Sequence, residues 1–197
     1  MDLLAHGPDG ARSCDAVAET SDPATHDRNA GAIEYQQWEI SLIGERDPAE
    51  VQAKLPAQVR RLIESAGASV AQRPSPDAWS AAEVLAHLVD TEIIYSARYR
   101  YIVAHEDPPL PGYDPELLIA RLHPRIDEEN LADLLATLTV LRAANVALWN
   151  RLSIAERHRV GVHAERGRET IDTAFRQVAG HGLLHLEQMR DALPAAV

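Results

Sequence analysis

The chain has 197 residues, of which 46% are hydrophobic and 25% are charged, a composition typical of one folded domain rather than of a disordered chain. Acidic residues outnumber basic ones 30 to 19, and the net charge of −11 argues against direct binding to nucleic acid or to an anionic membrane surface. The single cysteine, Cys14, excludes an intramolecular disulfide and a thiolate zinc cluster, which favours a cytoplasmic location.

The first 32 residues differ in composition from the rest of the chain. They are rich in Asp, Ala, Gly, Ser and Thr and show no sustained apolar period. This pattern predicts an acidic, mobile N-terminal tail at residues 1–32, followed by one folded domain at residues 33–197. The alternative is that the first stretch packs onto the domain as an extra helix or arm.

Helical signals begin after the predicted tail. Asp47 and Pro48 have the residue types of an N-cap and a first helical position. Apolar residues then recur with a helical period as far as Gly67. We therefore expect the first long helix to begin at residue 48 and to end near Gly67.

The second helix has the clearest start in the chain. Ser80 and Glu83 have the spacing of a capping box, in which each side chain bonds to the backbone of the other residue. The helix is expected to run from about residue 81 to 103. A proline-rich crossover at residues 107–115 follows, and this segment cannot form a regular helix.

The second half of the chain repeats the helical pattern. We expect a short helix at residues 116–122, a long one from about 127 to 152, and a last one from about 170 to 193. Asn145 is the only polar residue in the apolar stripe of the third long helix. A glycine-bearing loop is expected at residues 160–169.

Together these elements predict an all-α fold. Four long amphipathic helices with one long, proline-rich crossover in the middle indicate a four-helix bundle. No strand pattern or internal repeat stands out. No uninterrupted apolar run approaches the roughly 20 residues of a membrane helix, so no membrane span is expected. Dimerisation through a face of the bundle is a further expectation.

Three of the nine histidines lie on predicted core faces. His181 and His185 are four residues apart and therefore project from the same side of one helix. His87 lies on the apolar stripe of another helix. Three imidazoles from two facing helices can surround one cation. The alternative is that each is an ordinary core histidine held by hydrogen bonds, and the spacing alone leaves both readings open.

Residues near these histidines are candidates for supporting roles. Asp90 and Gln188 each come three residues after a candidate ligand, where they can orient an imidazole ring. Arg98 either contacts the anionic end of a substrate or, as is more common for a buried arginine, pairs with a core carboxylate. Asn145 either lines the pocket or sets the register of the bundle, and register is the commoner role.

Glycines and acidic residues beside the histidines have less specific interpretations. Gly180 and Gly182 flank His181 inside a helix, where glycine is unfavourable unless a neighbouring group approaches closely. Local tolerance explains them equally well. For Glu92 and Glu187, exposure to solvent is the expected state.

Two segments of the chain resemble the motifs of a known family. The segment from Trp79 to Glu92, followed by Arg98, resembles the first motif of the DinB superfamily. The stretch from His163 to Met189, which contains both histidines of the pair, resembles its last motif. The resemblance covers about residues 45–193. It implies a four-helix bundle with a three-histidine metal site, carried here by His87, His181 and His185.

The resemblance also implies an activity. Members of this family include transferases and isomerases that use low-molecular-weight thiols, so the leading hypothesis is a metal-dependent enzyme acting on a small molecule, with thiol S-transfer as its most specific form. Imidazole ligands suit divalent transition metals such as zinc, nickel or iron. A metal-dependent hydrolase is the second hypothesis, and a non-catalytic stress-response or interaction bundle is the third. Gly182 departs from the pattern, because relatives often carry an acid there.

Overall fold

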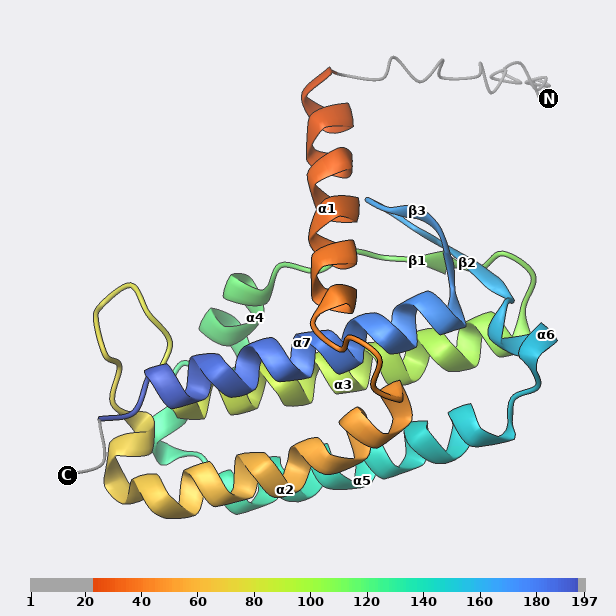
Figure 1. Cartoon of the computed structure of the whole chain (residues 1–197). Helices are drawn as coiled ribbons and strands as arrows, with labels where there is room; N and C mark the ends of the chain where they lie inside the picture. The colour runs from red at the N-terminus through yellow and green to blue at the C-terminus, as the bar shows by residue number, and fades with distance from the viewer. Residues whose placement is uncertain (1–22, 195–197) are drawn as a thin grey trace, which may run out of the picture.

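The structure is a computed structural model, and it describes residues 23–194. Cys14 and most of the predicted tail lie outside the described residues. Four long helices form a bundle: α2 (Pro48–Ala66), α3 (Ala81–Ala104), α5 (Leu131–Arg151) and α7 (Ile171–Asp191). Helices α2 and α3 each pack against both α5 and α7. In Figure 1, α3 and α7 form one layer and α2 and α5 the other. The predicted four-helix bundle is confirmed.

The starts of the long helices follow the capping signals in the sequence. The Asp47 side chain accepts a hydrogen bond from the Ala49 N–H at 2.7 Å and caps α2. Ser80 and Glu83 form the predicted capping box at the start of α3, with a bond of 2.8 Å from the Ser80 N–H to the Glu83 carboxylate. These bonds satisfy N–H groups that have no partner within the helix.

Helix α5 begins four residues later than predicted. The segment Ile126–Glu128 forms the short 3₁₀ helix η2, and Asn130 then caps α5 by accepting a hydrogen bond from the Ala132 N–H at 3.1 Å. Asn130 can cap the helix because its side-chain oxygen reaches an N–H group of the first turn that has no partner within the helix. The short helix α4 (Pro115–Leu122) follows the proline-rich crossover as expected.

The N-terminal boundary predicted at residue 32 falls inside a helix. Helix α1 spans Pro23–Ser41, and residues 1–22 lie outside the described part of the chain, so the division into a mobile tail and a domain stays a prediction. Among residues 31–41 of α1, the buried ones are Gln36 and Glu39, whereas Tyr35 and Trp38 are exposed. No apolar stripe therefore marks this helix in the sequence. Figure 1 shows α1 standing upright on the side of the bundle formed by α3 and α7.

A small sheet replaces the expected loop at residues 160–169. Strands β2 (Val160–His163) and β3 (Gly167–Thr170) form an antiparallel hairpin, and β1 (Pro109–Leu110) in the crossover pairs parallel to β2. The prediction of no strands is therefore wrong. In β2 the buried residues are Gly161 and His163 while Val162 is exposed, so the usual apolar-in pattern is inverted.

The remaining short elements connect the bundle helices. The 3₁₀ helix η1 (Gly67–Ala71) follows α2, and α6 (Ile154–Arg157) joins α5 to the hairpin. The hairpin, α1, α4 and the crossover all lie on the same side of the bundle, above α3 and α7 (Figure 1). They enclose the pocket described below.

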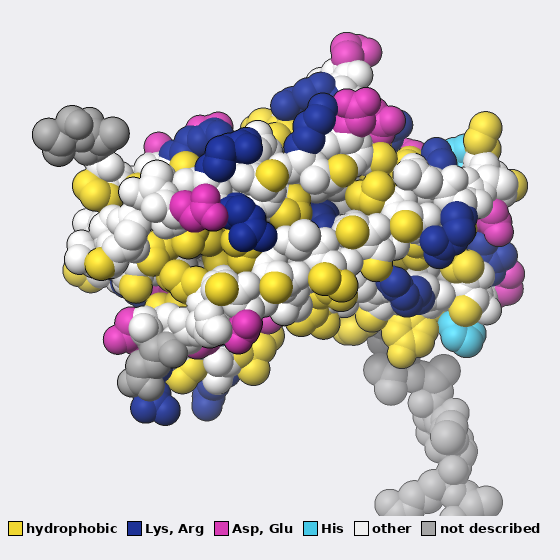
Figure 2. Space-filling view, turned by 90° about the horizontal axis from the view of Figure 1, so that it is seen from below, with side chains coloured by type: hydrophobic (Ala, Val, Ile, Leu, Met, Phe, Trp, Pro, Cys, Tyr) yellow, Lys and Arg dark blue, Asp and Glu magenta, His cyan; other side chains and the backbone are white. Residues whose placement is uncertain are grey.

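Helix α5 is the one described helix that is long and apolar enough, by length and composition, to cross a membrane. In the fold it packs against α2 and α3 and buries Arg142 and Asn145. We therefore interpret it as a bundle helix. The face formed by α2 and α5 carries many hydrophobic side chains with arginines among them (Figure 2).

Candidate metal centre and its pocket

Three histidine side chains from two helices converge at one point in the structure. His87 comes from α3, and His181 and His185 come from successive turns of α7. The Nε2 atoms of His87 and His181 are 3.1 Å apart, and the ring centroids of the three residues lie 4.2–5.0 Å from one another. One nitrogen from each ring lies within 4.8 Å of the other two.

The environment keeps these imidazoles neutral. Burial, followed by the nearby His185, lowers the pKa of His87 to about 3. Burial lowers the pKa of His185 to about 4, and burial together with the other two histidines holds the pKa of His181 well below its usual value. A neutral imidazole is the form that binds metal ions, because its free nitrogen carries a lone pair.

Gln188 determines which nitrogen of His185 is available. The Nδ1 atom of His185 lies 2.6 Å from the Gln188 Oε1 atom, which can only accept a hydrogen bond. The proton therefore resides on Nδ1, and Nε2 is left as a ligand atom. This is the orienting contact that the spacing of Gln188 suggested.

The histidine cluster fits a divalent transition metal by its own chemistry. The Nδ1 atoms of His87 and His181 are buried and have no hydrogen-bond partner among residues 23–194. With the proton of each ring on Nδ1, the Nε2 lone pairs of His87 and His181 face each other at 3.1 Å without a donor, which is unfavourable in an apolar interior. A single cation coordinated by the Nε2 atom of each ring would use these lone pairs, and three protein ligands would leave coordination positions open.

The cluster forms one wall of a pocket of about 230 Å³. Helix α1 and the β2–β3 hairpin cover it, and the crossover closes another side. Besides the three histidines, its lining residues are Tyr35, Glu39, Trp79, Tyr95, Tyr113, Pro115, His163, Glu165, Arg166, Gln177 and Val178.

Asp90 does not contact the histidine cluster. Its carboxylate lies 3.2 Å from the Nε2 atom of His123, whose Nδ1 atom lies 2.9 Å from Glu129. The expectation that Asp90 orients a ligand ring is therefore wrong. Asp90 instead ties α3 to the segment between α4 and α5.

Arg98 has no carboxylate partner within the described part of the chain. Its Nη2 atom donates to the Pro111 carbonyl oxygen at 2.5 Å, and its guanidinium lies 4.7 Å from the centroid of the Tyr95 ring and 5.6 Å from that of Tyr113. The expected ion pair with a core carboxylate is wrong. Arg98 lies directly behind pocket-lining residues.

Asn145 belongs to a buried network between α3 and α5 and does not line the pocket. It donates to Glu92 and to Ser96 at 2.7 Å in each case. Glu92 is fully buried rather than exposed as expected, and its Oε2 atom lies 2.7 Å from Arg142 Nε. These contacts fit the register role for Asn145.

The sequence pattern that defines the DinB superfamily matches residues 53–189. The chain is a member of the DinB superfamily. A search of curated proteins found no match. Among solved structures, the fold is similar to YfiT from Bacillus subtilis, described as a probable metal-dependent hydrolase with an unusual four-helix bundle topology. The two share 19% sequence identity and a TM-score of 0.68, and the similarity covers 74% of this chain and 83% of YfiT.

Several pocket residues of this DinB-superfamily protein were not predicted from the sequence. Glu39 on α1 is fully buried, and its Oε2 atom accepts a hydrogen bond of 2.8 Å from Gln177, which precedes His181 by one helical turn. Burial raises the pKa of Glu39 to about 7 against the opposing effects of Gln177 and Arg166. Its Oε1 atom is buried without a hydrogen-bond partner among the described residues.

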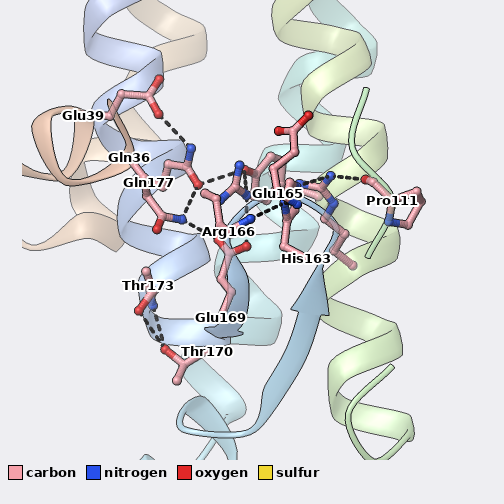
Figure 3. Close-up of polar contacts among 12 residues, drawn as sticks. Gln36, Glu39, Pro111, His163, Glu165, Arg166, Glu169, Thr170, Thr173 and Gln177 are labelled. Carbon is pink, nitrogen blue, oxygen red and sulfur yellow. Dashed lines mark hydrogen bonds and ion pairs between the residues drawn. The ribbon is translucent and has the colours of Figure 1, made fainter. Parts of the chain in front are cut away.

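Gln177 links Glu39 to the hairpin through a chain of buried polar groups. Its Oε1 atom accepts from Gln36 at 2.8 Å and from the Tyr95 hydroxyl at 3.0 Å. Gln36 also donates to Glu169 at 2.7 Å. Figure 3 shows this chain running from Glu39 to Glu169. Because nearly every member has a partner, the chain fixes the carboxylate of Glu39 in the pocket wall.

Proposed function

We propose that this DinB-superfamily protein is a metal-dependent enzyme in which a small nucleophile, water or a low-molecular-weight thiol, attacks a small-molecule electrophile. The observation that carries the proposal is the cluster of three neutral histidines in the wall of a small pocket that also contains a buried carboxylate. A purely structural metal site would be closed by protein ligands, whereas three imidazoles leave positions open.

Each pocket residue has a distinct role in this proposal. His87, His181 and His185 would hold the ion, and Gln188 fixes the ring of His185. A bound divalent ion supplies Lewis acidity, which polarises an electrophile and makes water or a thiol easier to deprotonate. Glu39 accepts the proton of the nucleophile, because its carboxylate lines the pocket and its pKa of about 7 suits a general base at neutral pH.

The two reactions share this proton path. In hydrolysis, water adds to an acyl carbon, the bond to the leaving oxygen breaks, and the proton taken up by Glu39 passes to the leaving group. In thiol transfer, the thiol sulfur forms the new bond to carbon, and the leaving group departs with the electron pair of the bond that breaks. The thiol proton, taken up by Glu39, compensates the negative charge of the leaving group. YfiT is described as a probable hydrolase, and thiol transfer follows from the family resemblance. A reducing cytoplasm would supply such thiols.

Activity assays distinguish the two reactions. Protein loaded in turn with zinc, nickel or iron is assayed for release of p-nitrophenol from p-nitrophenyl acetate and for transfer of cysteine or glutathione to 1-chloro-2,4-dinitrobenzene. We expect at least one activity to depend on metal and to fall by 100-fold or more in Glu39→Gln, whereas Glu34→Gln, an exposed residue of α1, serves as the control.

Absence of both activities in metal-loaded protein would favour the non-catalytic interaction bundle instead. Activity that is independent of metal would contradict the proposal. The homodimer that the sequence led us to expect stays a prediction, which sedimentation of the purified protein tests.

A further inference from the structure

A cluster of hydrogen-bond donors that the proposed reaction does not use lies in the wall of the pocket and directly behind it. Arg98 on α3 is only 3% exposed, and its Nε and Nη1 atoms have no hydrogen-bond partner among residues 23–194. Its contacts are the Pro111 carbonyl oxygen, two aromatic rings and, at 3.3 Å, the Nε2 atom of His163. A buried guanidinium is normally paired with a carboxylate, because removing an unpaired charge from water is costly.

His163 on β2 adds a donor to this cluster. Its Nδ1 atom accepts hydrogen bonds from the backbone N–H groups of Glu165 at 3.1 Å and Arg166 at 3.3 Å. In a neutral imidazole the proton must then reside on Nε2. This Nε2 atom lies 3.3 Å from the Nη2 atom of Arg98. Two N–H donors therefore face each other with no acceptor between them.

Arg166 in the hairpin turn faces the pocket itself. Its Nη2 atom donates to Glu169 at 2.9 Å and contacts the Tyr95 hydroxyl at 3.4 Å. Its Nε atom is buried without a partner, and its Nη1 atom makes no hydrogen bond to a described residue. Figure 3 shows Arg166 and His163 projecting from the hairpin towards the same space.

The nearby carboxylates do not neutralise both arginines. Glu169 is shared between Arg166 and Gln36, and it makes no ion pair with Arg98. Glu39 is bonded to Gln177, and Glu165 is exposed. Glu169 pairs with Arg166, and the charge of Glu39 also acts on Arg166, so neither buried carboxylate pairs with Arg98. Arg98 is left without an ion pair among the described residues, and three N–H groups (Nε and Nη1 of Arg98 and Nε of Arg166) have no acceptor there.

We propose that Arg98, His163 and Arg166 form a subsite for the carboxylate group of a small-molecule ligand. His163 and Arg166 line the pocket and contact the carboxylate, and Arg98 supplies the uncompensated charge behind them. The claim that this ligand is also the substrate rests on the proposed function. The substrate class is then a small carboxylic acid with its reactive group towards the three histidines.

A carboxylate suits this subsite better than a phosphate. The cavity of about 230 Å³ also contains Glu39 and Glu165, which would repel a doubly charged group more strongly than a singly charged one. Arginine and a carboxylate match in geometry, since the two oxygens can accept parallel N–H bonds.

Binding to metal-free protein tests this subsite apart from any catalysis. Chelator-treated protein is titrated with sodium propionate, with propionamide as the uncharged equivalent of the same shape, and with inorganic phosphate, and amide chemical shifts are followed by NMR. We expect saturable binding of propionate with shifts centred on β2 and the hairpin turn, at least tenfold weaker binding of propionamide, and weaker binding of phosphate.

Two variants identify the residues responsible. Arg166→Gln is expected to weaken propionate binding by tenfold or more. The control is Arg168→Gln, which should leave binding unchanged, because Arg168 lies on the same hairpin but is exposed and paired with Asp107.

Arg98→Met is expected to abolish the rise in Tm that propionate causes, while the unliganded protein keeps or gains stability. A loss of Tm without ligand would instead mark Arg98 as structural.

Other outcomes overturn the proposal. No saturable propionate binding, equal binding of propionamide, or unchanged binding in Arg166→Gln would refute the subsite, and phosphate binding tighter than propionate would refute the choice of carboxylate. His185→Ala is expected to retain propionate binding. The subsite and the proposed metal-dependent function can therefore fail independently of each other.

Discussion

Gly180 of α7 touches the backbone of α1 at Glu39. A Cβ atom at position 180 would lie 1.8 Å from the Glu39 carbonyl oxygen, far closer than two such atoms can approach. This contact explains a glycine in the middle of a long helix, and it confirms the close approach that was one of the two explanations for Gly180. It also brings the Glu39 side chain to the pocket wall, where it bonds to Gln177, one helical turn before His181.

Gly180→Ala should displace α1 from the bundle. Alanine is the better helix former by about 1 kcal/mol, but its Cβ atom meets backbone that cannot move alone, and overpacking of this kind typically costs about 1–3 kcal/mol. We expect faster amide hydrogen exchange throughout α1 and little change in α3 and α5. Gly182→Ala is the matched control, because its Cβ atom would meet a flexible Leu55 side chain at 2.8 Å. Equal exchange in α1 for both variants would contradict this account.

Glu39→Gln should change how stability depends on pH. In the folded protein the pKa of Glu39 is raised from 4.5 to about 7, mainly by burial. The folded state therefore holds this proton between about pH 4.5 and 7 while the unfolded chain has released it, so this contribution to stability is lost as the pH rises through 7. Glutamine has no charge to bury. Thermal unfolding should show the variant gaining stability relative to the wild type between pH 5 and pH 8.5; a difference that is constant with pH would refute the raised pKa.

Acid should destabilise the metal-free protein through its buried histidines. Their folded-state pKa values lie far below 6.5: about 3 for His87 and His163, about 4 for His185, and well below the usual value for His181. Below pH 6.5 the unfolded chain binds more protons than the folded one, and each extra proton lowers stability by about 1.4 kcal/mol per pH unit. The four histidines together lower the stability in acid by more than the protonation of Glu39 raises it. Urea unfolding should give a markedly lower free energy of unfolding at pH 5 than at pH 7.5. His163→Gln should make this difference smaller.

Breaking the buried pair between Glu92 and Arg142 should destabilise the bundle more than breaking a surface pair. Both side chains are at most 1% exposed, and removing one partner of a buried pair costs about 3–5 kcal/mol because the other charge is left alone. Glu92→Gln should therefore lower the free energy of unfolding by this amount. The control is Glu50→Gln, which breaks an exposed pair with Lys54 and should cost less than about 1 kcal/mol. Comparable losses in the two variants would contradict the buried assignment.

The bundle was predictable because its signals are local. Ser80 and Glu83, three positions apart, mark the start of α3, and each long helix except α1 carries an apolar stripe over several turns. The two histidines of α7 are one turn apart, so their common direction follows from helix geometry alone. A cluster of these two histidines with His87 could be proposed because His87 also lies on an apolar stripe.

The rest of the pocket depends on contacts that no local pattern encodes. Over residues 31–41, helix α1 buries Gln36 and Glu39 rather than apolar residues, and the apolar period of the sequence does not predict this helix. The β2 strand buries His163 and exposes Val162, which inverts the pattern of a half-buried strand. The position of Asp90 was also not predictable from local spacing. Its distance from His87 along the sequence suggested a contact with that ring, but Asp90 contacts His123, which is 33 residues away.

Metal content of purified variants tests the central claim most directly. Elemental analysis after equilibration with zinc should find one divalent ion per chain in the wild type and in His123→Ala, a histidine bonded to Asp90 and Glu129 outside the cluster. His87→Ala, His181→Ala and His185→Ala should each lose most of the ion while keeping the helical content of the wild type. Full metal content in His185→Ala, or none in the wild type, would contradict the three-histidine site.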